Sequence, residues 1–231
     1  MTRQAVIVST ARTPIGRAYR GAFNATPSPT LAAHAIRAAV ERSGVDPAEV
    51  EDCLMGAALQ QGVQYTIGRT AALRAGLPVT TAGMSIDRQC ASGLMAIATA
   101  AKQIIVDRMD VLVAGGVESI SLVQTPEMRL GADSELVAMH KDIYMPMLQT
   151  AEVVAKRYSV SRERQDEYSL RSQQRTAAAQ AAGLFDEEIV PVTALMMVKD
   201  KATGETSMQE VTLARDECNR PQSTFEDLAR L

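Results

Sequence analysis

Cys90 is the residue of this sequence best suited to covalent chemistry. It lies in the polar turn Asp87-Arg88-Gln89-Cys90-Ala91-Ser92-Gly93, between a short extended stretch and an alanine-rich stretch typical of a helix. A thiol at the start of a helix is close to unsatisfied backbone N–H groups and to the positive end of the helix dipole, which favour its thiolate form. The N–H groups of the small residues that follow could also stabilise an oxyanion. Cys90 is therefore a candidate nucleophile.

The alternative for any single cysteine is a structural role, because free cysteine is among the most buried residue types. The sequence has two further cysteines, Cys53 and Cys218, and an odd number at wide spacing is typical of a reducing compartment. We interpret Cys53, which lies in an apolar run, as a packing residue. The two histidines, His34 and His140, are interpreted as a helix-surface residue and a loop residue. Without a Cys-x-x-Cys pair or clustered histidines, the sequence predicts no histidine- or cysteine-based metal site.

The composition is that of a globular protein, since 46% of the 231 residues are apolar and 22% are charged. The formal net charge of -3 argues against a nucleic-acid partner, whose phosphates require clustered lysine and arginine. The chain does not open on a signal-peptide pattern, and we find no apolar run near the roughly 18 residues that a membrane span requires. We therefore expect a soluble, cytoplasmic protein with neither a nucleic-acid nor a membrane partner.

The elements that must position Cys90 alternate between strands and helices. Apolar runs of strand length at residues 5–10, 53–58 and 111–114 are separated by helical patterns, two of which are predicted to end at Gly44 and Gly76. This alternation predicts an α/β fold with a right-handed, mainly parallel sheet. Ligands of such sheets bind beyond the carboxyl ends of the strands, where Cys90 falls. The helix predicted at residues 92–106 is apolar on nearly all sides, which predicts a place in the core.

The pattern changes after residue 120. Residues 121–146 are rich in methionine and aperiodic, as expected of a loop excursion that covers a site. A long amphipathic helix capped by Ser161 follows, and residues 194–213 have the pattern of a hairpin. We therefore predict two domains: residues 1–120, which carry the nucleophile, and residues 121–231, an α-rich loop domain.

Seven motifs, taken together and in order, resemble the thiolase family across essentially the whole chain. They are Arg12-Thr13-Pro14-Ile15-Gly16, Asp87-Arg88-Gln89-Cys90-Ala91-Ser92-Gly93-Leu94, Gly115-Gly116-Val117-Glu118-Ser119, Thr150-Ala151-Glu152, Gln165-Asp166-Glu167-Tyr168 with Ser172-Gln173, Glu188-Ile189-Val190-Pro191-Val192, and Asp216-Glu217 through Arg220 to Thr224. Any one of these motifs is weak evidence, whereas seven in the family's order are strong evidence.

The resemblance implies a fold of two similar α/β halves, with the loop domain inserted into the first half, and assembly as a homodimer or tetramer. It also implies that Cys90, which matches the family's nucleophilic cysteine, accepts an acyl group from acyl-coenzyme A as a thioester. A second thiol or a carbanion would then resolve this thioester, in thiolytic cleavage of a 3-ketoacyl-CoA or in the reverse Claisen condensation. Coenzyme A is implied as substrate and product, with no tightly bound cofactor.

Two residues of the loop domain are carried over as binding residues. Arg220 falls where thiolases place an arginine near the adenine end of coenzyme A, and its alternative is an ordinary surface arginine. Met147 belongs to a Pro146-Met147 pair at a position where the biosynthetic acetoacetyl-CoA enzymes have His-Met. This departure resembles thiolases that act on longer or bulkier 3-ketoacyl chains.

The sequence also lacks parts of the family pattern. Thiolases draw an activating histidine and a second cysteine from their C-terminal half, and neither segment is present, nor is the strand that should complete the first half. Because thiol catalysis needs a base and an acid, we expect these 231 residues, as the N-terminal half and loop domain of a 3-ketoacyl-CoA thiolase, not to complete the cycle alone. Two alternatives stay open: a non-catalytic thiolase-like protein that binds coenzyme A or pairs with a partner chain, and an unrelated cysteine hydrolase.

Overall fold

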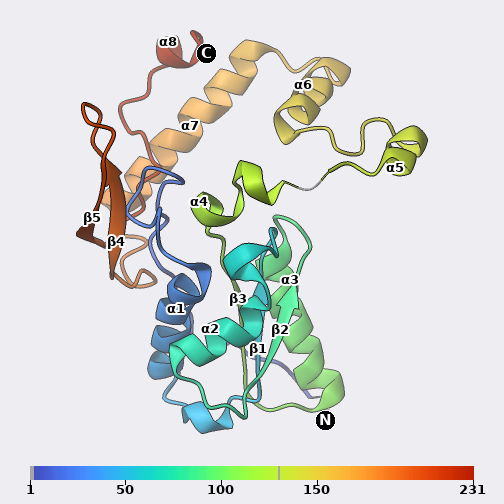
Figure 1. Ribbon diagram of the computed structural model, residues 1–231, viewed down its shortest axis with the longest axis vertical. Coiled ribbons are helices and arrows are strands. Elements are labelled where there is room, and N and C mark those ends of the chain that lie inside the picture. The colour runs from blue at the N-terminus through green and yellow to red at the C-terminus, as the bar shows by residue number, and fades with distance from the viewer. Residues whose placement is uncertain (1–2, 130) are drawn as a thin grey trace. The chain divides into compact units, whose positions relative to one another are not determined.

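The computed structural model describes residues 3–129 and 131–231, and the chain divides into two compact units (Figure 1). The first unit comprises Met1–Met128 and Glu187–Cys218, and the second comprises Arg129–Asp186 and Asn219–Leu231. Residues 187–218 therefore group with the unit that contains Cys90. The division into two domains, residues 1–120 and residues 121–231, stays a prediction.

A parallel sheet organises the first unit and confirms the α/β class. Its strands are β1 (Asp52–Gly56), β2 (Ala82–Ile86) and β3 (Leu112–Gly116), in the order β2-β1-β3. In register, Gly56 at the end of β1 lies beside Ile86 of β2 and Gly116 of β3. The carboxyl ends of the three strands are therefore level, and the loops that follow them start from one edge of the sheet.

Helices cover both faces of this sheet. The helices are α1 (Ser28–Ser43), α2 (Ile67–Ala75) and α3 (Ser92–Lys102), the last extended by a π-helical turn at Gln103–Asp107. Because successive side chains of a strand point to opposite faces, Cys53 and Met55 pack with α1 and α2, whereas Leu54 packs against Ala96 and Ala100 of α3. Gly44 and Gly76, at φ 71 and 92, end α1 and α2 as predicted.

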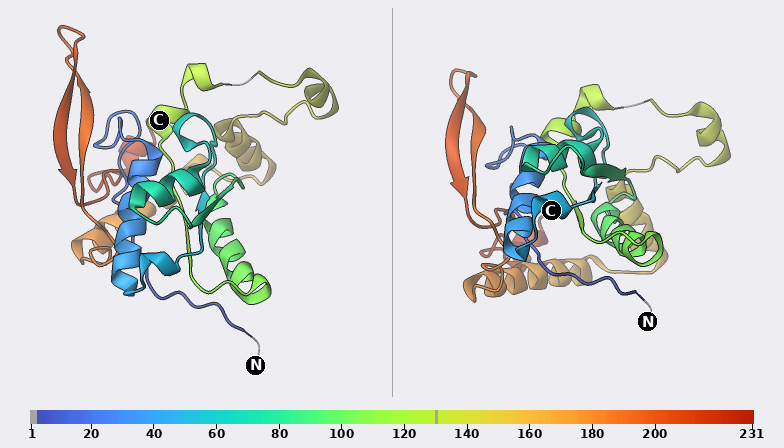
Figure 2. Two further views of the ribbon diagram at one scale, coloured as in Figure 1. Left: turned by 60° about the horizontal axis from the view of Figure 1, so that its bottom comes forward. Right: turned by 90° about the horizontal axis from the view of Figure 1, so that it is seen from below.

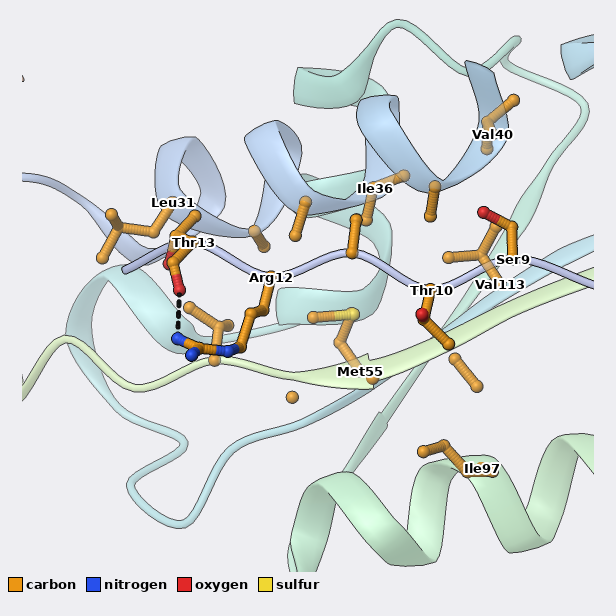
Figure 3. A pocket seen from close by; sticks show the side chains of 18 of the residues that line it. Ser9, Thr10, Arg12, Thr13, Leu31, Ile36, Val40, Met55, Ile97 and Val113 are labelled. Carbon is orange, nitrogen blue, oxygen red and sulfur yellow. Dashed lines mark hydrogen bonds between the residues drawn. The ribbon is translucent and has the colours of Figure 1, made fainter. Parts of the chain in front are cut away.

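The prediction of a strand at residues 5–10 is wrong for this structure. The segment is extended but makes no ladder, and Val6, Ile7 and Val8 are 71%, 74% and 71% exposed. It runs along a cavity of about 850 Å³ lined by side chains of α1, β1, β3 and α3 (Figure 3). The apolar pattern is present, but a strand forms only where a neighbouring backbone accepts its hydrogen bonds.

The prediction that the helix at residues 92–106 is buried on all sides is also wrong here. Only Ser92, Ala96 and Ala100 of α3 are buried, and Leu94 is 71% exposed. One helix face packs on the sheet, and its apolar opposite face is uncovered in the described part of the chain. The helical stretch Gln89–Asp107 is also long and apolar enough to cross a membrane, a test that core helices of soluble proteins pass as well.

The remaining elements of the first unit include the predicted hairpin, which is confirmed. Its strands β4 (Val192–Lys199) and β5 (Thr206–Leu213) are antiparallel. The buried side chain of Asn24 accepts from the backbone N–H of Met197 at 2.9 Å and donates to its carbonyl at 2.8 Å, so it occupies the free edge of β4. Short helical turns complete the unit: η1 (Pro47–Glu49), η2 (Gly62–Gln64), α4 (Ile120–Val123) and η4 (Pro126–Met128).

The second unit is helical, as predicted for the loop region. It contains α5 (Ser134–Met139), α6 (Met147–Arg157), α7 (Arg162–Ala181) and α8 (Phe225–Leu228), the last two visible at the orange and red end of the colour scale in Figure 2. Ser161 caps α7 as expected, because its side chain accepts from the N–H of Arg164.

Candidate active site

The first turn of α3 packs directly on the carboxyl ends of β1 and β3. A Cβ added to Gly56 would lie 2.3 Å from the carbonyl carbon of Ser92, and one added to Gly116 would lie 3.0 Å from the Cα of Gly93. Any side chain at Gly56 would push the helix off the strand. These glycines therefore allow the helix N-terminus, and the turn before it, to lie against the edge of the sheet where ligands of parallel sheets bind.

Hydrogen bonds within the turn hold Cys90 at the mouth of α3. The buried hydroxyl of Ser92 accepts from the N–H of Arg88 at 2.9 Å and donates to the carbonyl of Gln89. The carboxylate of Asp87 accepts from the N–H of Gln89 at 2.8 Å. Gln89 adopts φ 49, a left-handed conformation that is costly for a residue with a side chain. The result is a tight turn that leaves Cys90 exposed, two residues before α3 begins.

The three thiols differ in accessibility. Cys90 and Cys218 are exposed, whereas Cys53 is completely buried in β1. Burial, together with the nearby Asp52, raises the pKa of Cys53 to about 12. Because the thiolate is the reactive form, Cys53 is inert at neutral pH, as expected for a packing residue.

A buried polar cluster, which the sequence analysis missed, joins the loops that follow β1 and β3. The side chain of Gln64 is fully buried; its carbonyl oxygen accepts from Ser28 and from the N–H of Ser119, each at 2.7 Å. Its amide group donates to the carbonyl of Leu59 at 2.6 Å and to the carboxylate of Glu118. The only sequence signal was Glu118 within the motif at residues 115–119, since a lone glutamine in a loop has no distinctive pattern.

His34 is not placed to act on Cys90 from the sheet edge. His34 is half-buried on α1, across the sheet from α3, and burial together with Arg37 and Arg74 lowers its pKa. His140 is an exposed residue of the second unit at the end of α5. Among residues 3–129 and 131–231, the structure contains no group of three or more His, Cys, Asp or Glu side chains that could hold a metal ion.

The other two predicted site residues, Arg220 and Met147, belong to the second unit. The backbone N–H of Arg220 donates at 2.8 Å to the side-chain oxygen of Gln173 on α7, which also accepts from Asn219 at 2.9 Å. This leaves the Arg220 side chain exposed. Met147 is the first residue of α6 and is 78% exposed. Within the second unit, Arg220 is therefore an exposed residue attached to α7, and Met147 is an exposed residue at the start of α6.

Comparison with known proteins identifies the family. Residues 5–231 match the N-terminal domain of thiolase. The chain belongs to the thiolase family. It is 38% identical, over 99% of its length, to the 3-ketoacyl-CoA thiolase of Bacillus subtilis, and 42% identical, over 81%, to the acetyl-CoA acetyltransferase of Cupriavidus necator. It is also 38% identical, over 98%, to the peroxisomal 3-ketoacyl-CoA thiolase B of Mus musculus.

This thiolase chain spans about half the length of the curated relatives it matches. It covers 59% of the Bacillus subtilis protein, 50% of the Cupriavidus necator protein and 52% of the mouse protein. The resemblance inferred from the seven motifs is therefore confirmed for the N-terminal domain of the family.

Three of the seven thiolase motifs meet around Arg12. Its guanidinium binds Glu188 at 2.7 Å and Asp216 at 2.8 Å, and its backbone N–H donates to the carbonyl of Glu188 at 2.9 Å. Asp216 also accepts from the N–H of Ile15 at 2.8 Å. Burial by itself raises the pKa of Asp216, but the hydrogen bonds from Arg12 and Ile15 outweigh it and hold that pKa below its ordinary value. These motifs therefore join the ends of the hairpin segment to the N-terminal loop.

Proposed function

We propose that this chain is the N-terminal part of an acyl-CoA acyltransferase of the thiolase type, with Cys90 as the acylated nucleophile. The observation that carries the proposal is the exposed Cys90 thiol, held by Ser92 at the mouth of a helix whose first turn rests on glycines of two strand ends. An accessible thiol beside a helix N-terminus has the two features that thiol acylation requires: access to the substrate and stabilisation of the thiolate.

The proposed first step transfers the acyl group to sulfur. The Cys90 thiolate attacks the thioester carbonyl carbon of acyl-coenzyme A, a new C–S bond forms, and the negative charge moves to the carbonyl oxygen. Backbone N–H groups at the start of α3 stabilise that oxyanion. The intermediate collapses, the bond to the coenzyme A sulfur breaks, and coenzyme A leaves as a thiolate that takes up a proton. The product is an acyl-cysteine that keeps the energy of a thioester.

In the second step the acyl group leaves Cys90. In the synthetic direction the carbanion of a second acyl-coenzyme A attacks the acyl-cysteine, forming a C–C bond and a 3-ketoacyl-coenzyme A. In the degradative direction a 3-ketoacyl-coenzyme A acylates Cys90 with loss of acetyl-coenzyme A, and the thiol of free coenzyme A releases the shortened acyl group. Both directions need a base and an acid. We expect the chain alone to stop at the acyl-cysteine, because His34 lies across the sheet from α3.

We assign binding roles to two residues of the helical unit. Arg220 is expected to contact the adenine end of coenzyme A, and Met147 is expected to line the space for the acyl chain and to favour longer or bulkier 3-ketoacyl groups. Their exposed side chains are compatible with contact to a ligand. Coenzyme A then acts as substrate and product, without a tightly bound cofactor. The protein is expected to work in the cytoplasm as a homodimer or tetramer, although the mouse relative is named as peroxisomal.

The decisive experiment is acylation followed by peptide mass spectrometry. Incubation with acetyl-CoA or acetoacetyl-CoA should add an acetyl group to the peptide that contains Cys90, and Cys90→Ala should abolish the adduct. Cys218, the other exposed thiol, is the control within the same molecule. An adduct on Cys218 alone would overturn the assignment. Coenzyme A binding with every cysteine unmodified would instead favour the non-catalytic alternative.

A further inference from the structure

We propose that Glu118 is a positioning residue for Cys90. Its carboxylate ties together the loops at the carboxyl ends of β1 and β3, on which the nucleophile's turn rests. One carboxylate oxygen accepts from the backbone N–H of Ala58 at 2.8 Å, and the other accepts from the side-chain amide of Gln64. This inference rests on the proposed role of Cys90 and extends it to a residue that does not itself touch the substrate.

The connection from Glu118 to Cys90 passes through backbone hydrogen bonds between neighbouring strand ends. Ala57, beside the Ala58 amide that Glu118 binds, donates to the carbonyl of Ile86 at 3.0 Å, and Ile86 directly precedes the turn that carries Cys90. On the other side, the N–H of Val117 donates to the carbonyl of Gly56 at 3.0 Å. Glu118 therefore links the loops at the ends of β1 and β3. At the same point, the end of β1 is hydrogen-bonded to the end of β2.

The helix N-terminus is in contact with the same strand ends. The backbone of Ser92 and Gly93 lies so close to Gly56 and Gly116 that no side chain fits between them. A shift of the strand ends must therefore move the first turn of α3, because there is no space to absorb it. In the role proposed for Cys90, the amides of that turn would stabilise its thiolate, and they could do so only while the turn keeps its place beside the sulfur.

Gln64 explains why a carboxylate is needed at residue 118. Its carbonyl oxygen is already occupied by Ser28 and Ser119, so only its N–H groups can face Glu118. Glu118 must then accept from two donors, Gln64 and the Ala58 amide. A glutamine at residue 118 has one acceptor oxygen and one NH2 group, so one of the two donors would face another donor. Glu118→Gln is nearly isosteric and therefore removes one link while keeping the volume.

The test is the pH profile of iodoacetamide alkylation at Cys90, which requires no acyl-CoA. If Glu118 positions the helix terminus, Glu118→Gln should raise the pH midpoint of Cys90 alkylation, because the thiolate loses amide donors. Removal of a nearby negative charge alone would do the opposite and lower the midpoint. Acylation by acetyl-CoA should slow by about tenfold or more, since misplacing a reacting group by ~1 Å costs on the order of 100-fold.

Controls separate positioning from general damage and from failure of the proposed function. Gln61→Ala removes another side-chain hydrogen bond of the same loop, from Gln61 to the carbonyl of Val123 at 2.6 Å, and should leave the midpoint unchanged. The alkylation rate of Cys218 should be equal in all variants. If Glu118→Gln does not fold, Glu118→Asp keeps the charge but shortens the reach, and the midpoint should again rise. An unchanged or lowered midpoint would refute the positioning role. Absence of an acyl adduct on wild-type Cys90 would refute the proposed function alone.

Discussion

The side chain of Ser92 and the left-handed Gln89 together determine how Cys90 is presented. A hydroxyl that accepts from Arg88 and donates to Gln89 closes the turn from within, so the thiol stays outside while the serine is buried. Cys53 differs from Cys90 in accessibility. It is inside a strand, completely buried, and burial raises its pKa to about 12. The same residue type is thus buried in a strand at one position and exposed in a turn at the other.

At the residue scale we predict a clear division among the thiols. Iodoacetamide at about pH 8 should alkylate Cys90 and Cys218 and leave Cys53 unmodified, because a thiol with a pKa of about 12 carries almost no thiolate at that pH. Peptide mass spectrometry of the native protein gives the extent at each site. Unfolding in urea should make Cys53 react as well, which serves as the control. Modification of Cys53 in the folded protein would contradict the buried position of β1.

At the scale of elements, the contact between α3 and the strand ends is the feature on which the site depends. Gly56 and Gly116 leave room for the backbone of Ser92 and Gly93, and the strand register places them side by side. Two apolar surfaces of the first unit are not covered by any of the described residues. Val6, Ile7 and Val8, and Leu94 on the outer face of α3, are apolar but exposed. A cavity of about 850 Å³ lies beside residues 5–10.

The prediction at this scale concerns Gly56. Gly56→Ala should lower the free energy of unfolding by about 1–3 kcal/mol, the usual cost of overpacking, because the new methyl group would meet the backbone of Ser92. It should also slow alkylation of Cys90. The matched control is Gly115→Ala in β3, where an added Cβ meets only the sulfur of Met55 at 3.9 Å. Urea unfolding should show a change of no more than about 1 kcal/mol for this control. Equal effects of the two substitutions would show that the close contact has no energetic consequence.

At the scale of the whole molecule, each compact unit is built from segments that are distant in sequence. Arg12 binds Glu188 and Asp216, which lie before and after the β4–β5 hairpin. These contacts attach residues 187–218 to the N-terminal loop of the first unit. Glu217 adds to this closure by accepting from the N–H of Arg17 at 2.8 Å. These contacts hold the hairpin segment in the unit that contains Cys90.

This closure predicts a dependence of stability on acid. The pKa of Asp216 in the folded chain is lower than its ordinary value of 3.8, so its contribution to stability is present above that value and is lost as pH falls through the folded pKa. Asp216→Asn should therefore reduce stability near neutral pH and flatten the acid limb of the unfolding free energy below about pH 4. Urea titrations across that range give the measurement, with the exposed Asp142→Asn as control. An acid limb identical to the wild type would refute this role.

The sequence by itself determined several local elements and pointed to Cys90 as the candidate nucleophile. Helix stops at Gly44 and Gly76, the cap at Ser161 and the hairpin follow from short-range patterns, because backbone conformation and side-chain periodicity are local properties. The seven motifs likewise pointed to the thiolase family, which the match over residues 5–231 confirms.

Only the tertiary structure decided which of these elements find partners. The apolar run at residues 5–10 has the composition of a strand, but a strand exists only where another backbone pairs with it. The helix at residues 92–102 has an apolar surface all round, but burial depends on what covers each face. The cluster of Gln64 and Glu118 could not be foreseen because its residues are 54 positions apart and meet only where two strands end together. Long-range pairing sets both the burial of the elements and the setting of the site, and no local pattern encodes it.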